Sequence, residues 1–244
     1  MTDGLLLIHA FPLDARMWQP QLDAIVGIQA IAPDLPGFGG AEPSGDVMTM
    51  GDAAARCVRA LDEARLERAV VCGLSMGGYV ALELWRSARA RIAGLVLANT
   101  RAGADAPDGA AGRRALAARL RSEGNVLVDA PPPLLSEDAS PELVERVRGW
   151  IGDQDPEAIA AAALGMAERP DSTQDLAGID VPTLVITSEQ DRLIPPDVST
   201  AMSEQIRGAE LAVISDAGHL SNLEAPERFD ELLRLHLRRC GVIG

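Results

Sequence analysis

One stretch decides the fold of this chain: Ala69-Val70-Val71-Cys72-Gly73-Leu74-Ser75-Met76-Gly77-Gly78. The apolar run at its start predicts a buried strand, and residues 78–85 predict a helix directly after it. Glycines two positions either side of Ser75 permit a bend so tight that side chains there would collide. The following helix directs backbone N–H groups and the positive end of its dipole toward the serine. This strand–turn–helix arrangement predicts that Ser75 is a nucleophile.

Short apolar runs recur along the chain, separated by segments with helical character. We predict six strands, at residues 5–8, 28–32, 69–72, 95–98, 183–186 and 211–214. Helices are predicted at 49–64, where Thr49 and Asp52 have capping-box spacing, and at 226–239. The strands are continuously apolar rather than alternating, which is typical of a mostly parallel sheet covered on both faces. The predicted class is therefore α/β.

The interval from residue 101 to residue 180 contains no predicted strand. It is longer than the single helix and two loops that an ordinary crossover needs. Helical patterns in it cover residues 113–121, 141–150 and 156–167, and Pro131-Pro132-Pro133 interrupts them. We predict a helical cap at 101–180, inserted into a core formed by 1–100 and 181–244. Such a cap would cover the carboxyl ends of the strands, where open α/β sheets bind ligands.

A nucleophilic serine needs a base and an orienting carboxylate. His219 follows the last predicted strand directly, whereas His236 falls on the apolar stripe of the final helix and is expected to be structural. Asp191 follows the fifth strand at the same edge of the sheet. Asn99 follows the fourth strand and has no charge to stabilise an imidazolium. We therefore predict that Ser75, Asp191 and His219 act as nucleophile, acid and base.

The oxyanion of an acyl-transfer reaction needs two N–H donors. Met76, the residue after the nucleophile, is one predicted donor. The other is expected from the loop after the first strand, residues 9–12. Pro12 has no N–H and favours an extended conformation at the residue before it. Phe11 is therefore the second predicted donor.

These segments together resemble the α/β-hydrolase family. The likeness is to the small capped type, which includes cofactor-free esterases, perhydrolases (non-haem haloperoxidases) and 3-oxoadipate enol-lactonases. The matching segments are residues 9–14, 34–39, 73–78, 191–195 and 218–219. The resemblance implies the α/β-hydrolase fold and the same roles for Ser75, Asp191, His219, Phe11 and Met76.

The chain departs from the family pattern in two places. Ala10 stands where the family usually has glycine, so its methyl group is expected to crowd the oxyanion loop or narrow the acyl pocket. Only four residues precede the first predicted strand, where the family usually has a β-hairpin. We therefore expect a six-stranded sheet without that hairpin and with a shortened edge.

The composition narrows the possible partners and cofactors. The chain has 244 residues, a net charge of −14 and no lysine, which excludes a Schiff-base or phosphate-loop lysine. The acidic charge argues against nucleic acid or an anionic membrane as a partner. The three cysteines form no CxxC pair, and the apolar run at 5–8 is too short for a signal peptide or membrane span. We expect a cytoplasmic protein that uses neither a metal nor an organic cofactor.

The predicted reaction is hydrolysis of a small carboxylic ester or lactone through an acyl-enzyme on Ser75. Candidates for the substrate pocket are Ala10, Leu13, Trp18, Trp150, Met166, Leu193 and Leu220. Arg101 and Arg192 lie near the predicted site, where they either bind an acidic substrate or pair with structural carboxylates.

Two alternatives to simple ester hydrolysis stay open. One is hydrolysis of an anionic enol-lactone in the manner of the 3-oxoadipate enol-lactonases, which would require a cap arginine in the pocket. The other is non-catalytic binding of a small signalling molecule on the same fold.

Overall fold

A computed structural model describes residues 3–244, which form one six-stranded sheet with helices around it. The strands are β1 (Asp3–Ile8), β2 (Ala30–Ile31), β3 (Arg68–Leu74), β4 (Ile92–Ala98), β5 (Thr183–Ser188) and β6 (Glu210–Ile214). Every neighbouring pair is parallel, in the order β2-β1-β3-β4-β5-β6. The predicted α/β class and six-stranded sheet are confirmed, and all carboxyl ends meet at one edge.

The strands differ in burial according to their place in the sheet. The central strands β3 and β4 are buried along nearly their whole length, as continuous apolar runs predict. The edge strand β2 has two residues rather than the predicted five. Pro33 follows it closely and has no N–H to extend the ladder. At the other edge, β6 leaves most of its residues exposed or half-buried.

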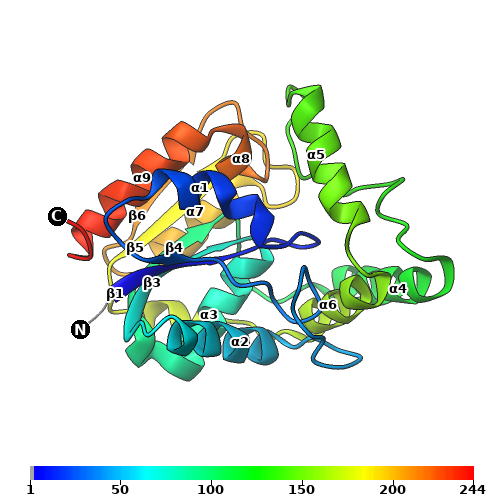
Figure 1. The fold of residues 1–244 in the computed structure, drawn as a ribbon, viewed down its shortest axis with the longest axis horizontal. Coiled ribbons are helices and arrows are strands. Elements are labelled where there is room, and N and C mark those ends of the chain that lie inside the picture. Colours follow the sequence, from blue (N-terminus) through cyan, green and yellow to red (C-terminus); the bar gives the residue numbers. More distant parts are fainter. Residues whose placement is uncertain (1–2) are drawn as a thin grey trace.

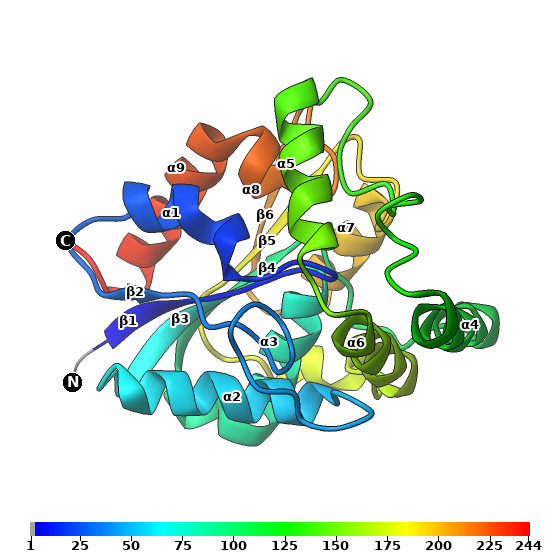
Figure 2. The same ribbon diagram turned by 45° about the vertical axis from the view of Figure 1, so that its right-hand side comes forward.

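Helices cover both faces of the sheet (Figure 1, Figure 2). On one face α1 (Gln19–Ala24) packs against α9 (Pro226–Arg239), and on the other α2 (Met50–Glu63) packs against α3 (Met76–Ala88). The remaining helices of the core are α7 (Pro196–Glu204) and α8 (Ser221–Glu224), with short 3-10 turns η1 (Ala15–Trp18) and η2 (Arg89–Arg91). A further 3-10 turn, η3 (Thr173–Gly178), lies just before β5. The predicted capping box of α2 is confirmed, because Thr49 and Asp52 each accept the other's backbone N–H at 3.0 Å.

Three helices lie between β4 and β5: α4 (Pro107–Glu123), α5 (Pro141–Gly152) and α6 (Pro156–Glu168). They lie beyond the carboxyl ends of the strands, away from both chain termini (Figure 1, Figure 2). Each occupies a segment predicted to be helical, and α4 begins six residues before the predicted 113–121. The helical insertion is thus where the sequence places it, while its division as a separate domain at 101–180 stays a prediction. Within residues 3–244, no helix is long and apolar enough to cross a membrane.

Two of the three histidines have structural positions. His9 is fully buried at the end of β1, where Nδ1 lies 3.1 Å from the Ala10 carbonyl and Nε2 accepts the Leu35 N–H at 3.0 Å. His236 lies on the buried side of α9, as predicted, and burial lowers its pKa to about 4. Neither histidine lines the cavity beside Ser75. Only His219 is left for chemistry at that site.

Candidate active site

Ser75 lies in the turn between β3 and α3 with a left-handed backbone conformation, φ 56° and ψ −115°. Such a conformation is strained for a residue with a side chain. A Cβ on Gly73 would collide with the carbonyl of Gly77, and a Cβ on Gly77 would collide with the carbonyl of Ile8. The Thr100 hydroxyl holds the turn by donating to the Ser75 carbonyl at 2.8 Å. The predicted need for both glycines is confirmed.

His219 and Asp191 form a buried hydrogen-bonded pair. Nδ1 of His219 lies 2.8 Å from Oδ2 of Asp191, and both residues are less than 5% exposed. Nε2 of His219 is buried and has no hydrogen-bond partner in the described part of the chain. His219 and Ser75 line the same cavity. With Nδ1–H donated to the carboxylate, Nε2 is left as a proton acceptor at the site that also holds Ser75.

The carboxylate of Asp191 accepts four hydrogen bonds. Oδ2 receives His219 at 2.8 Å and the Asn99 amide at 2.9 Å, while Oδ1 receives the N–H groups of Leu193 and Ile194, both at 2.9 Å. Burial by itself raises the pKa of Asp191, but the bond to His219 and the other donors outweigh it and leave the pKa below its ordinary value. The site therefore keeps this buried carboxylate ionised.

Asn99 connects the loop of Asp191 to the loop of His219. Its backbone is left-handed, with φ 45°, and its amide also donates to the Ser188 hydroxyl at 2.6 Å. Its carbonyl oxygen accepts the Ser221 hydroxyl at 2.6 Å, and Ser188 in turn donates to the Gly218 carbonyl. Sequence reasoning treated Asn99 only as a position without charge, and missed this role.

That Phe11 and Met76 donate to an oxyanion stays a prediction, and the structure gives the surroundings of both residues. Phe11 lines the cavity beside Ser75, and Met76 begins α3 directly after it. Among the hydrogen bonds of residues 3–244, neither backbone N–H has an acceptor. The N–H of Ala10, by contrast, is already donated to the sulfur of Met17 at 3.2 Å.

The cavity beside Ser75 and His219 has a volume of about 210 Å³. About 10–15 Å³ of such volume is enough for one water, so the cavity has room for a small substrate. Its walls are mostly apolar, and the insertion supplies many of them. Within the described residues, no cluster of His, Cys, Asp and Glu could hold a metal ion; that no cofactor is used stays a prediction.

Only part of the predicted pocket lining is correct. Met166 and Leu193 line the cavity. The other candidates do not, namely Ala10, Leu13, Trp18, Trp150 and Leu220. Four of these are completely buried in the core, and Trp150 packs half-buried against it. Being close to the site in sequence did not bring these side chains to the cavity, because core packing directs them elsewhere. Arg192 is also outside the lining and pairs with Glu137 at 2.8 Å.

Several lining residues were missed from the sequence. They are Tyr79, Arg113, Leu116, Leu127, Pro132, Leu134 and Ile194. Two of them carried a local signal, since Tyr79 lies one turn after Ser75 and Ile194 lies three residues after Asp191. The others come from α4 and the loop that follows it, and nothing local connects them to Ser75.

The chain was compared with known families and proteins. The sequence pattern of the Alpha/beta hydrolase family matches residues 5–232. Among solved structures, a thermophilic esterase from Thermogutta terrifontis with malate bound is 40% identical, with 98% of this chain and 92% of that chain covered and a TM-score of 0.93. The enol-lactonase from Burkholderia xenovorans LB400 is 27% identical, covering 96% and 92%, with a TM-score of 0.86.

Curated relatives include proteins of different names. The dihydrolipoyllysine-residue acetyltransferase component of the acetoin cleaving system of Cupriavidus necator is 31% identical over 97% of this chain, which spans 64% of that protein. The 3-oxoadipate enol-lactonase 1 of Acinetobacter baylyi is 28% identical, covering 94% of this chain and 86% of that protein. With the parallel sheet, the glycine-flanked turn and the family match in agreement, the chain belongs to the alpha/beta hydrolase family.

Proposed function

We propose that the protein is a serine hydrolase that cleaves a small carboxylic ester or lactone through an acyl-enzyme on Ser75. One observation carries this proposal. The imidazole of His219 is held by Asp191 at 2.8 Å, while its other nitrogen is unpaired in the site that Ser75 lines. A base oriented by a carboxylate beside a strained serine is the arrangement that acyl transfer requires.

In the proposed reaction, Oγ of Ser75 attacks the substrate carbonyl carbon while Nε2 of His219 takes the hydroxyl proton. Asp191 keeps the imidazole in the required tautomer and stabilises its positive form. The N–H groups of Phe11 and Met76 bind the oxyanion, aided by the positive end of the α3 dipole. His219 then gives its proton to the leaving alkoxide. Water attacks the acyl-enzyme by the same route, which releases the acid and restores Ser75.

Hydrolysis of an anionic enol-lactone is the second candidate. This second hypothesis requires an arginine from the insertion in the pocket, and Arg113 of α4 lines the cavity. Two of the similar proteins are also named enol-lactonases. The chemistry at Ser75 is the same in both cases, except that the leaving group of a lactone stays attached to the acyl chain.

The test uses p-nitrophenyl acetate and butyrate together with a fluorophosphonate probe. We expect the wild-type protein to hydrolyse the esters and to be labelled, and Ser75→Ala to lose both properties. Ser87→Ala is the matched control, because Ser87 is an exposed serine on the same helix that bonds the Glu83 carbonyl. A folded wild-type protein that is neither active nor labelled would favour the third hypothesis, a non-catalytic binding protein.

A further inference from the structure

Asp105 lies at the start of the insertion with 2% of its side chain exposed, and three arginines surround it. Arg113 contacts it at 2.6 Å and Arg169 at 3.0 Å, and Arg101 forms a third ion pair. Burial raises the pKa of Asp105, but hydrogen bonds from Arg169 and Arg113 outweigh it, so the pKa is lower than usual. Three cations thus share one ionised, buried carboxylate.

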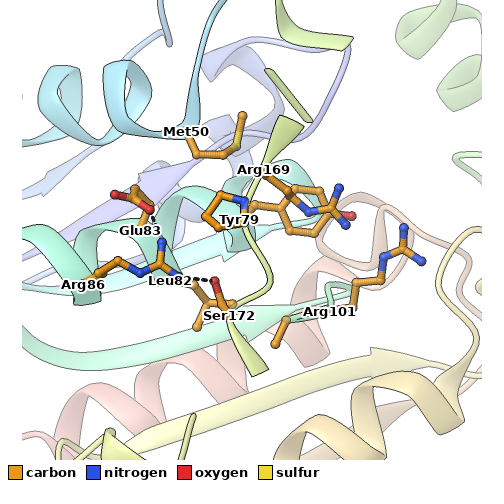
Figure 3. Close-up of a pocket in the computed structure, with 10 residues that line it drawn as sticks. Met50, Tyr79, Leu82, Glu83, Arg86, Arg101, Arg169 and Ser172 are labelled. Atoms are coloured by element: carbon orange, nitrogen blue, oxygen red, sulfur yellow. Dashed lines mark hydrogen bonds and ion pairs between the residues drawn. The ribbon is translucent and has the colours of Figure 1, made fainter. Parts of the chain in front are cut away.

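Arg169 is held by the protein on several sides, although its Nε, like that of Arg101, is buried without a hydrogen-bond partner. Its guanidinium donates to the carbonyls of Met166 and Gly103, both at 2.8 Å, and pairs with Asp105. It also lies over the ring of Tyr79, 4.1 Å from the centroid, as Figure 3 shows. A guanidinium with contacts on so many sides serves packing, so Arg169 is a structural member of the cluster.

Arg101 and Arg113 each make fewer hydrogen bonds than Arg169. Each donates to Asp105 through one nitrogen, and the hydrogen bonds of residues 3–244 include no other acceptor for either. Nε of Arg101 is buried without a partner. Asp171 lies close enough to Arg169 to count as a second acid. Two acids against three arginines still leave one net positive charge.

Both of these arginines line the cavity that contains Ser75 and His219, and none of its lining residues is acidic. The contrast with the whole molecule is large, because the chain carries a net charge of −14. A buried guanidinium N–H without a partner, such as Nε of Arg101, is costly unless an acceptor meets it. The N–H donors of a planar arginine guanidinium match the two oxygens of a carboxylate in geometry.

Arg86, a further arginine nearby, pairs with other groups than Asp105. Arg86 lies at the opposite side of the close-up from Arg101 and donates to Ser172 at 3.0 Å (Figure 3). It also pairs with Glu83 and with Asp175. The crevice that Arg86 lines, together with Arg101 and Arg169, has a volume of about 10 Å³, room for one water at most. The anion site is therefore confined to Arg101 and Arg113.

We infer that Arg101 and Arg113 form a carboxylate-binding subsite, and that the substrates are short esters or lactones carrying a free carboxylate. The inference rests on the proposed function, since the same cavity must hold the reacting carbonyl beside Ser75. Asp105 positions both guanidiniums without neutralising them. A half-ester of a short dicarboxylic acid has the size and charge for this cavity.

The experiment compares monomethyl glutarate with its neutral isostere, methyl 4-carbamoylbutanoate, by pH-stat titration of released acid. The two esters differ only in a carboxylate against an amide. We expect wild-type kcat/KM to favour the charged ester by at least about tenfold, the range of a charge-assisted hydrogen bond. In Arg113→Gln the ratio falls toward one. Arg114→Gln is the matched control, because Arg114 is an exposed neighbour on α4 and its removal changes the net charge equally.

Arg113 also stabilises Asp105, so thermal melting must show that the variant is folded. Arg101→Gln is the second variant, with the same expected loss of the charged-to-neutral ratio. Calorimetric binding of glutarate to the wild-type protein provides a readout that needs no turnover. We expect glutarate to bind, glutaramide not to bind, and rising NaCl to weaken glutarate binding.

The outcomes separate the two proposals. Hydrolysis of both esters at equal kcat/KM, without glutarate binding, would overturn the carboxylate subsite and leave the serine hydrolase intact. Glutarate binding that weakens in Arg113→Gln, without hydrolysis of any ester, would support the subsite and overturn the hydrolase. A ratio that persists unchanged in folded Arg101→Gln and Arg113→Gln also counts against the subsite.

Discussion

The amide of Asn99 and the imidazole of His219 share one oxygen of the Asp191 carboxylate, at 2.9 Å and 2.8 Å. Asn99 comes from the end of β4, and Asp191 from the loop after β5. The same amide also holds the Ser188 hydroxyl, and its carbonyl oxygen accepts from Ser221 beside the histidine. One uncharged side chain therefore connects the Asp191 carboxylate with the segment that carries the His219 imidazole.

We predict that Asn99→Ala lowers kcat by about 10- to 100-fold, the range for losing a hydrogen bond to a charged group. KM should change little, because Asn99 does not line the cavity. Asp191 has a depressed pKa, so its charge is lost only as the pH falls through that low value. Removing a donor raises the pKa. The variant should therefore lose the Asp191 charge at a higher pH than the wild-type protein does, and its kcat should fall more steeply at the acidic end of the pH profile.

Ser221→Ala is a milder variant that tests the same positioning role of Asn99. It removes the donor that fixes the Asn99 carbonyl oxygen but leaves the bond to Asp191 in place. We expect a smaller loss of kcat in the same direction. If folded Asn99→Ala kept both the wild-type kcat and the wild-type pH profile, Asn99 would not position the catalytic acid.

Asp191→Asn should reduce kcat by about 10⁴-fold with little change in KM, because an amide cannot stabilise the imidazolium or hold its tautomer. The measurement is steady-state hydrolysis of p-nitrophenyl butyrate. Glu189→Gln is the matched control, since Glu189 is an exposed carboxylate two residues earlier. Equal losses in both variants would contradict the assignment of Asp191 as the acid.

Gly165→Ala should destabilise the protein by roughly 1–3 kcal/mol or more, as overpacking does. Gly165 lies in α6, where an added Cβ would collide with the Met48 carbonyl of the core. The same substitution at Gly112 in α4 has open space around it. Gly112→Ala should therefore stabilise by about 0.5–1 kcal/mol through the helix propensity of alanine. Urea denaturation measures both changes, and similar midpoints for the two variants would contradict the close approach of α6.

His236 should make the free energy of unfolding depend on pH. Burial lowers its pKa to about 4, against an ordinary value of 6.5. Between these values the unfolded chain binds more protons than the folded one, so stability falls as the pH drops from about 6.5 toward 4. The loss attributable to His236 approaches about 3 kcal/mol at the low end.

His236→Leu removes this proton uptake, so its unfolding free energy should fall less steeply over the same range. Part of the slope should persist, because burial also lowers the pKa of His9. Thermal melting at half-unit pH steps from 7 to 4 provides the comparison. Parallel curves for the wild-type protein and the variant would show that His236 does not titrate in this window.

Local chemistry was enough to predict the fold, the hydrogen bond between Asp191 and His219, and the meeting of Ser75 and His219 at one edge of the sheet. Gly73 and Gly77 indicate the tight turn, because a Cβ at either position would collide with backbone atoms. Asp191 and His219 could be placed together because each follows a strand, and parallel strands end at one edge of a sheet. The prediction made strand β2 too long. An apolar run gives no sign that a strand lies at the edge of the sheet, where it has only one neighbour to pair with.

The sequence by itself therefore determined the α/β class, the strained serine turn and the pairing of Asp191 with His219, all of which follow from short-range sterics and strand direction. Which side chains line the cavity depends on the tertiary structure alone. Arg113 and Leu116 reach it from α4, whereas Ala10, Leu13 and Leu220 turn into the core although they are nearer the site in sequence. Side-chain direction at such positions is set by packing between distant segments, and no local pattern encodes it.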